Sequence, residues 1–245
     1  DGNIVWRTVI DLPGAINDFV RTDGGCYLLV GHTPAFSGNN RSFTALIDHT
    51  GTLQWLHRHD LGERESFVRI IRSDNPSDPL FPYVVCGIRK NAGTSRDDIL
   101  LFTLNDQGTI DWMNQIGNVG TDDEFRFDLM NHAGGYLLTG FYINGGTLRP
   151  VLFHTDNLGV QAPSTEYQPN IIFYDIEPAA TGSDIFIAGQ LTSGDALLAK
   201  VTATGTPIWA LRFPSLTVFR KLLVQPKSND IYVVGQRDAT GQYRN

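Results

Sequence analysis

The chain has 245 residues, of which 41% are hydrophobic and 18% charged, and its formal net charge at pH 7 is −7. An acidic chain without a stripe of Lys and Arg lacks the electrostatic footprint of a nucleic-acid binder, so we expect no nucleic-acid partner. No apolar run approaches the roughly 20 residues that a membrane helix needs, so we expect no membrane span. The composition is typical of a globular protein.

The chain opens on a short phrase in which a tryptophan stands four residues after a glycine. All four tryptophans occur in this phrase, and a further copy ends in proline instead. The copies recur at intervals of about 50 residues, which indicates a repeat protein. Because the tryptophans share one phase, we expect each to pack in the same way in successive copies. The copies are Gly2 to Trp6, Gly51 to Trp55, Gly108 to Trp112, Gly159 to Pro163 and Gly205 to Trp209.

A second phrase follows in each copy: a β-branched or aromatic run that ends on glycine, typical of a buried strand. These runs are 28–31, 83–87, 137–140, 186–189 and 232–235. Gly, Asn and Asp precede most of them and suit tight hairpin turns. An alternating segment stands upstream of the turn, as at 16–20, and a third apolar segment follows the glycine, as at 43–48. The tryptophan phrase supplies a fourth strand.

Four short antiparallel strands in each repeat predict an all-β fold, a β-propeller of four-stranded antiparallel blades. A β-solenoid is the alternative, but its repeats are shorter and lack internal hairpins. A two-sheet sandwich would not explain one phase in every copy.

About five blades fit into this chain as a single domain. Either the ends join to close a five-bladed ring, or the chain is part of a longer propeller; both interpretations remain open. The expected blades are 15–60, 64–118, 123–168, 171–213, and 218–245 completed by 1–10.

The segment from Ala45 through Asp48 and Gly51 to Trp55 resembles the repeat of quinoprotein-like propellers, those with PQQ-type repeats. The resemblance implies that the tryptophan strand is the outer strand, and that its tryptophan docks between neighbouring blades. Since Pro163 replaces the tryptophan, we expect the third blade to have the least regular outer strand and the loosest outer seam. The Thr-Gly turns and the runs ending on glycine also resemble secreted bacterial propellers. That likeness implies an extracellular, cell-surface or periplasmic location.

Quinoprotein enzymes hold a calcium ion with carboxylates and often use a vicinal cysteine pair. Cys26 and Cys86 stand far apart in the chain, and no carboxylate cluster occupies the corresponding positions. We therefore expect no cofactor, and we expect both cysteines to be small buried hydrophobes rather than a disulfide. No nucleophile elbow, P-loop, zinc-protease or dinucleotide motif is present, so no catalytic residue is predicted.

Metal ligands were sought among histidines and loop carboxylates. His57 and His59 alternate on one strand face, and Asp74, Asp78 and the acidic turn 121–124 could offer oxygen ligands to calcium. None has the spacing of a known metal loop, so solvated polar positions are the favoured interpretation and no metal is predicted.

The candidate binding residues lie on the innermost strands, where aligned charged positions could ring a central channel: Asp18, Arg69, Arg126, Asp175 and Arg220. The alternative is that these groups pair with one another and only fill the interior. Phe81, in the Pro-rich segment 73–82, is the candidate aromatic anchor for a partner. Further aromatics expected on surface loops are Phe36, Phe141, Tyr142 and Tyr243.

Three functions compete. The favoured one is a non-enzymatic extracellular or cell-surface module that binds a protein as a scaffold of a larger assembly. The second is a carbohydrate-binding propeller, which should repeat one aromatic and one acid in every blade, whereas the loops here differ. The third is an enzyme at the channel mouth, which should hold a carboxylate with a strongly shifted pKa in a deep pocket.

Overall fold

The computed structural model describes residues 4–34, 40–61, 64–75, 79–90, 97–117, 128–144, 146–214 and 216–237. Throughout these ranges the regular structure is β-strand, with no helix. The chain divides into two compact units, Asp1–Gly117 and Asn118–Asn245, which are described separately below.

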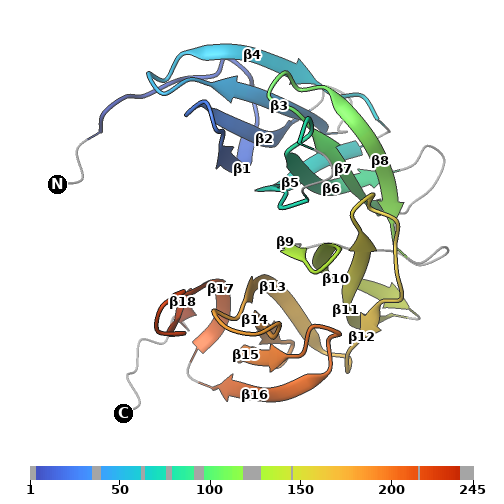
Figure 1. The fold of residues 1–245 in the computed structure, drawn as a ribbon. Helices are drawn as coiled ribbons and strands as arrows, with labels where there is room; N and C mark the ends of the chain where they lie inside the picture. The colour runs from blue at the N-terminus through green and yellow to red at the C-terminus, as the bar shows by residue number, and fades with distance from the viewer. Residues whose placement is uncertain are drawn as a thin grey trace. The chain divides into compact units, whose positions relative to one another are not determined.

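The first unit holds two four-stranded sheets in which each strand pairs with the next along the chain (Figure 1). All the pairings are antiparallel. The first sheet consists of β1 (Ala15–Arg21), β2 (Tyr27–Thr33), β3 (Arg41–Ile47) and β4 (Leu53–Arg58). The second consists of β5 (Arg64–Arg72), β6 (Tyr83–Lys90), β7 (Asp97–Leu104) and β8 (Ile110–Ile116).

The second unit repeats this arrangement twice and adds a two-stranded sheet. Its third sheet consists of β9 (Leu129–His132), β10 (Gly135–Asn144), β11 (Thr147–Asp156) and β12 (Thr165–Glu166). The fourth consists of β13 (Ile171–Pro178), β14 (Ile185–Leu191), β15 (Ala196–Val201) and β16 (Pro207–Phe213). The last pair is β17 (Leu216–Val224) and β18 (Ile231–Arg237). The expected class, repeated four-stranded antiparallel blades, is confirmed; their union in one domain stays a prediction.

A bulge in the first strand explains why the second strand carries glycine. In β1 the register with the second strand shifts between Ile16 and Asp18. The equivalent shifts in β5, β13 and β17 follow Phe67, Phe173 and Phe219. The bulged backbone comes close to the facing strand, so a Cβ on Gly31 would overlap the carbonyl oxygen of Ala15. Gly87, Gly189 and Gly235 meet the same obstruction. The runs end on glycine because no side chain fits there.

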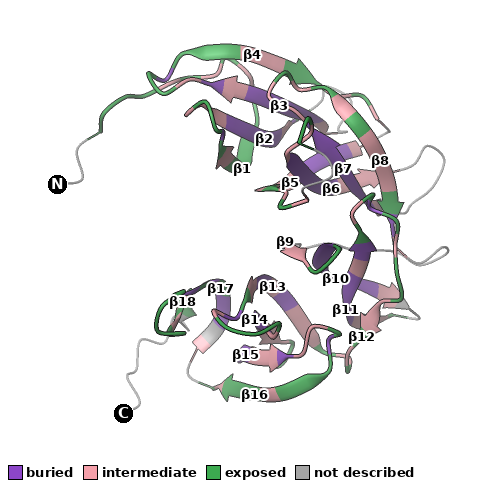
Figure 2. Ribbon diagram, in the orientation of Figure 1, coloured by how far each residue is buried: buried purple, intermediate pink, exposed green. Residues whose placement is uncertain are grey.

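Alternate residues of the second strand face the two neighbouring sheets. Leu28 and Val30 of β2 share a core with Phe67 and Ile70 of β5. In the second unit, Phe186 and Ala188 of β14 share a core with β17. The middle strands are therefore the most buried in both units, as Figure 2 shows. Period-two alternation between two apolar faces produces this stacking of sheets.

The tryptophan of the fourth strand docks on the following sheet, as the resemblance implied. Trp55 Nε1 donates a hydrogen bond to the carbonyl oxygen of Asp106 at 3.0 Å. A Cβ on Gly108, which has φ of +75°, would lie 2.9 Å from the Trp55 ring. The turn therefore needs glycine both for its backbone conformation and for the approach of the ring. For Trp55 the expected docking is confirmed.

Residues 4–10 carry the first copy of the phrase but are not a strand. Trp6 nevertheless lies over Gly51, and the Thr8 hydroxyl donates to the Gly51 carbonyl oxygen. The strand that this copy of the phrase predicts is therefore absent from 4–10, while the contact of its tryptophan with the turn is retained.

The third sheet differs from the others where Pro163 replaces tryptophan. Strand β12 has only two residues, so the predicted irregular outer strand is confirmed. An aromatic side chain nevertheless docks on the turn of the next sheet, as Trp55 does: Tyr167 Oη donates to the Gly205 carbonyl oxygen at 2.6 Å. Thr165 Oγ1 donates to the Thr204 carbonyl oxygen at 2.9 Å. The expectation that this blade has no aromatic side chain docked on the next sheet is therefore wrong, because Tyr167, downstream of Pro163, takes that role.

Both cysteines are thiols without a disulfide, Cys26 half-buried and Cys86 buried. The expected burial is therefore found for Cys86 but not for Cys26.

Candidate functional site

The candidate site is the bulged position of the first strands β1, β5, β13 and β17, with its equivalent just before β9, and is here called the clasp position. Its residue lies opposite the one that precedes the strand glycine, as Asp18 lies opposite Val30. In the third sheet Asp128 holds this place, because its backbone N–H donates to Thr139 Oγ1 at 2.9 Å and its carbonyl accepts from Thr139 N. The five clasp residues are Asp18, Arg69, Asp128, Asp175 and Lys221.

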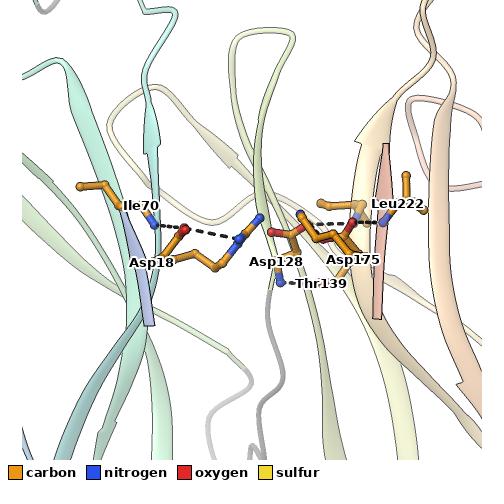
Figure 3. Close-up of polar contacts among 9 residues, drawn as sticks. Asp18, Ile70, Asp128, Thr139, Asp175 and Leu222 are labelled. Atoms are coloured by element: carbon orange, nitrogen blue, oxygen red, sulfur yellow. Dashed lines mark hydrogen bonds and ion pairs between the residues drawn. The ribbon is translucent and has the colours of Figure 1, made fainter. Parts of the chain in front are cut away.

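Each aspartate at a clasp position accepts a hydrogen bond from the backbone of the next sheet within its unit (Figure 3). Asp18 Oδ2 accepts from Ile70 N at 3.0 Å. Asp128 Oδ2 accepts from Ile176 N at 2.9 Å, and Asp175 Oδ2 accepts from Leu222 N at 2.6 Å. A bulge interrupts the ladder, and a carboxylate aimed at the following strand satisfies the amide next to it.

Cations at the clasp positions neutralise these carboxylates. Arg69 Nη1 lies 3.4 Å from Asp18 Oδ2. In the second unit Lys221 Nζ pairs with Asp175 Oδ1 and lies 3.8 Å from Asp128 Oδ2. Lys221 therefore serves two carboxylates.

Burial separates the clasps of the two units. The Asp18 side chain keeps 19% of its surface exposed, whereas Asp128 keeps 1% and Asp175 keeps 2%. Burial, followed by a hydrogen bond and charge repulsion from Asp128, raises the pKa of Asp175 to about 8. The bonds from Leu222 N and Lys221 act in the opposite direction. The two carboxyl groups consequently retain a proton at neutral pH, since two like charges at this depth cannot both ionise cheaply.

Of the residues predicted for this site, Asp18, Arg69 and Asp175 lie at clasp positions. Arg126 lies outside the described residues. Arg220 is displaced from the clasp: it is exposed, and its guanidinium stacks 4.3 Å from the centroid of the Tyr174 ring. Its neighbour Lys221 takes the clasp instead, because the bulge sends consecutive side chains to opposite faces.

Sequence reasoning missed Asp128 and Lys221. Counting back from the glycine of each second strand locates the first strand of each repeat. It does not say which residue occupies the clasp position, because the hairpins between first and second strands differ in length. A signal was present for Lys221: it stands two positions after Phe219, as Arg69 stands two positions after Phe67.

The aromatic residues predicted for surface loops differ in their burial. Phe81 lies in its predicted loop and is half-buried, beside the exposed Leu80. Phe141 and Tyr142 are buried on β10, so their expected exposure is wrong; the strand is longer than the apolar run predicts. Phe36 and Tyr243 lie outside the described residues.

The histidines considered as metal ligands have other contacts. The exposed His57 ring stacks on Trp55 with ring centroids 4.6 Å apart. His59 Nε2 lies 3.0 Å from Thr44 Oγ1, and burial lowers the pKa of His59 to about 4. Within the described ranges, no three His, Cys, Asp or Glu side chains gather as a metal site. Asp74 is exposed, while Asp78 and the turn 121–124 lie outside those ranges.

The clasp carboxylates bridge neighbouring sheets, and the Asp128–Asp175 pair can also store a proton. Blades joined by such bridges define the chain as a protein of the β-propeller class. In the ranges that the structure covers, no helix has the length and apolar character needed to cross a membrane.

Comparison with known proteins shows the fold alone. No family model and no curated protein matches the chain. A protein of unknown function from Bacteroides caccae is similar in structure, with a TM-score of 0.57 and 10% sequence identity over 94% of this chain and 73% of that one. A candidate 6-phosphogluconolactonase from Bacteroides uniformis has a TM-score of 0.44 and 12% identity, covering 95% of this chain and 84% of that one.

Proposed function

We propose that this chain is a non-enzymatic propeller module, extracellular or on the cell surface, that binds another protein within a larger assembly. The observation that carries the proposal is an exposed apolar face on β17 and β18. It consists of Leu223, Tyr232 and Val234, and here it is called the terminal-sheet face.

The equivalent positions in the preceding sheet show what such a face packs against. Phe186 and Ala188 of β14 stand three residues and one residue before their strand glycine, and they pack against the first strand of the next sheet. Tyr232 and Val234 occupy the same two positions before Gly235, yet 55% and 67% of their surfaces are exposed. The terminal-sheet face therefore has the pattern of a sheet-packing surface.

Leu223 extends this face, because it pairs with Tyr232 across the two strands and is itself exposed. Contiguous exposed apolar side chains that include an aromatic are typical of protein contacts. A flat strand pair suits a protein surface better than a small molecule, which would bind in a concave site.

The clasp residues favour structure over catalysis. Both oxygens of Asp175 accept from protein donors, Lys221 Nζ on one side and Leu222 N on the other. Asp18 Oδ2 is engaged by Ile70 N and Arg69. Carboxylates that tie neighbouring sheets together are poorly placed to act on a substrate.

Photo-crosslinking tests the proposal. A photoreactive amino acid at Leu223 in the producing cells should form one dominant protein adduct, identified by mass spectrometry. The same group at Lys227, on the exposed turn before β18, should form none. Tyr232→Glu should remove the Leu223 adduct. Equal adducts at both positions, or an adduct that survives Tyr232→Glu, would overturn the proposal. Protease accessibility on intact cells tests the location, because an extracellular module must be cleaved without lysis.

Carbohydrate binding remains the alternative, and the recurring fourth-strand aromatic is the feature that would support it. Trp55 already donates its indole N–H to Asp106. Asp48, the acid of the preceding turn, accepts from Thr50 and Thr52 through Oδ1 and from Gln54 through Oδ2. These groups are therefore engaged within the fold. A glycan array distinguishes the two functions: a blank array removes the alternative, and specific glycan retention would favour it.

A further inference from the structure

The first sheet borders two adjoining cavities. Residues 4–14 run across the face of this sheet that lies away from β5, and Ile10 and Leu12 pack against a buried cluster that includes Leu29 and Phe43. One cavity, of about 300 Å³, is bounded by these four residues, Trp6 and Ile16, among others. The other, of about 500 Å³, includes Leu12, Pro13, Arg41 and Arg58. Leu12 borders both, so the two cavities adjoin at this residue.

The two cavities differ in chemistry. The first is predominantly apolar, with aliphatic and aromatic side chains from the sheet and from the crossing segment. The second brings two guanidinium groups to one end, because Arg58 pairs with Phe43 across β3 and β4 while Arg41 begins β3. Asp60 also borders this cavity, so its end carries two guanidinium groups and one carboxylate beside an apolar floor.

Arg58 is the cation available to a ligand. It is exposed, and it has no hydrogen bond or ion pair with any residue that the structure describes. Arg41 Nη1 lies 3.1 Å from Asp60 Oδ1 and 3.8 Å from Glu65 Oε1. Asp60 is 78% exposed, so a competing anion can displace it at little cost, whereas Glu65 is buried and stays beside Arg41.

We propose that this groove binds an amphiphilic carboxylate, with the head group on Arg58 and Arg41 and the hydrocarbon chain in the cavity beneath Ile10 and Leu12. Charge complementarity selects an anion, because guanidinium groups bind carboxylates through paired N–H donors. The apolar floor selects a chain, and both cavities have volumes within the roughly 300–1,000 Å³ range of ligand sites.

Calorimetric titration with dodecanoate below its micelle concentration tests the proposal. Dodecanoate should bind, whereas acetate and dodecyltrimethylammonium should not, because one lacks the chain and the other reverses the charge. Shortening the chain should weaken binding by about fourfold for each methylene that leaves the cavity.

Variants locate the two ends of the ligand. Arg58→Gln should weaken dodecanoate binding about 10-fold, since a charge-assisted hydrogen bond is lost, and Arg58→Lys should restore part of it. Ile16→Asp, on the exposed rim of the apolar cavity, should weaken dodecanoate binding without changing the far-UV circular dichroism spectrum. Lys227→Gln, in the second unit, is the matched charge control and should bind like the wild type.

Several results would overturn the proposal. These are no dodecanoate binding, equal binding of the cationic amphiphile, or an Arg58→Gln variant that binds like the wild type. Sedimentation tests a different occupant of the face: a dimer that Ile16→Asp disrupts and dodecanoate does not would assign the groove to a second copy of the chain.

Discussion

The seam between the first two sheets and the seam between the third and fourth use the same two anchors with different side chains. At one end a clasp carboxylate binds the next first strand, Asp18 in the first unit and Asp128 in the second. At the other end an aromatic binds the next turn, Trp55 in one and Tyr167 in the other. The backbone fixes where a seam is anchored, whereas the aromatic side chain differs between the two seams.

Burial makes the two clasps behave differently. Asp18 is partly exposed and has Arg69 as counter-ion, while Asp128 lies beside a second buried carboxyl, Asp175, with Lys221 between them and solvent. The same hydrogen bond is therefore part of a simple ion pair in the first unit and of a proton-retaining cluster in the second. Four predictions test this comparison.

The largest expected effect is on the buried clasp. Asp175→Ala removes the acceptor of Lys221 and Leu222 N, and it should lower the free energy of unfolding by about 3–5 kcal/mol, the usual cost of breaking a buried pair. Asp18→Ala should cost about 1.5–3 kcal/mol, because its site is partly solvated. Urea denaturation followed by circular dichroism measures both. Equal losses would mean that burial does not distinguish the clasps.

Next come the aromatic anchors. Trp55→Ala should cost about 2–3 kcal/mol, less than a fully buried tryptophan, because the ring is half-buried. Because Tyr167 takes the place of the tryptophan in the third sheet, Tyr167→Ala should cost a similar amount in the same denaturation experiment. A negligible loss for Tyr167→Ala would restore the expectation, based on Pro163, that this seam is the loosest.

The third prediction concerns pH. The pKa of Asp175 rises from 3.8 to about 8 on folding, so the folded chain holds a proton that the unfolded chain releases. The stability this provides is fully present below pH 4 and is lost as pH rises to 8, by at most about 1.4 kcal/mol per pH unit. Asp175→Asn removes the titration, so its stability relative to wild type should rise over this interval. Parallel pH profiles for the two proteins would contradict the shared proton.

The smallest expected effect comes from one hydrogen bond between the third and fourth sheets. Tyr167→Phe keeps the ring and removes the donor to Gly205, and it should cost about 1 kcal/mol. Tyr232→Phe is the matched control, because its hydroxyl lies 3.3 Å from Gln225 on an exposed surface and should cost little. Thermal denaturation of the two variants measures both losses of stability. A control as costly as Tyr167→Phe would show that the seam contact contributes nothing specific.

Much of the fold was readable without coordinates, since two short phrases mark the strands. The run ending on glycine predicted each second strand, and the structure supplies the reason: the bulged first strand leaves no room for a Cβ at Gly31. The Gly-to-Trp spacing predicted each turn and the docking of Trp55. Of the candidate site, Asp18, Arg69 and Asp175 were found, whereas Asp128 and Lys221 were missed and Arg220 was misassigned.

By itself, the sequence determined the blade as a unit, because strand alternation, turn chemistry and glycine positions are local and recur at a constant period. Only the tertiary structure decided which side chains meet. Hairpins of unequal length shift the clasp register, so Asp128 joins Asp175 and Lys221, and a segment without strand pairing still brings Trp6 onto Gly51. These contacts depend on loop lengths and on packing between sheets, which no local pattern encodes.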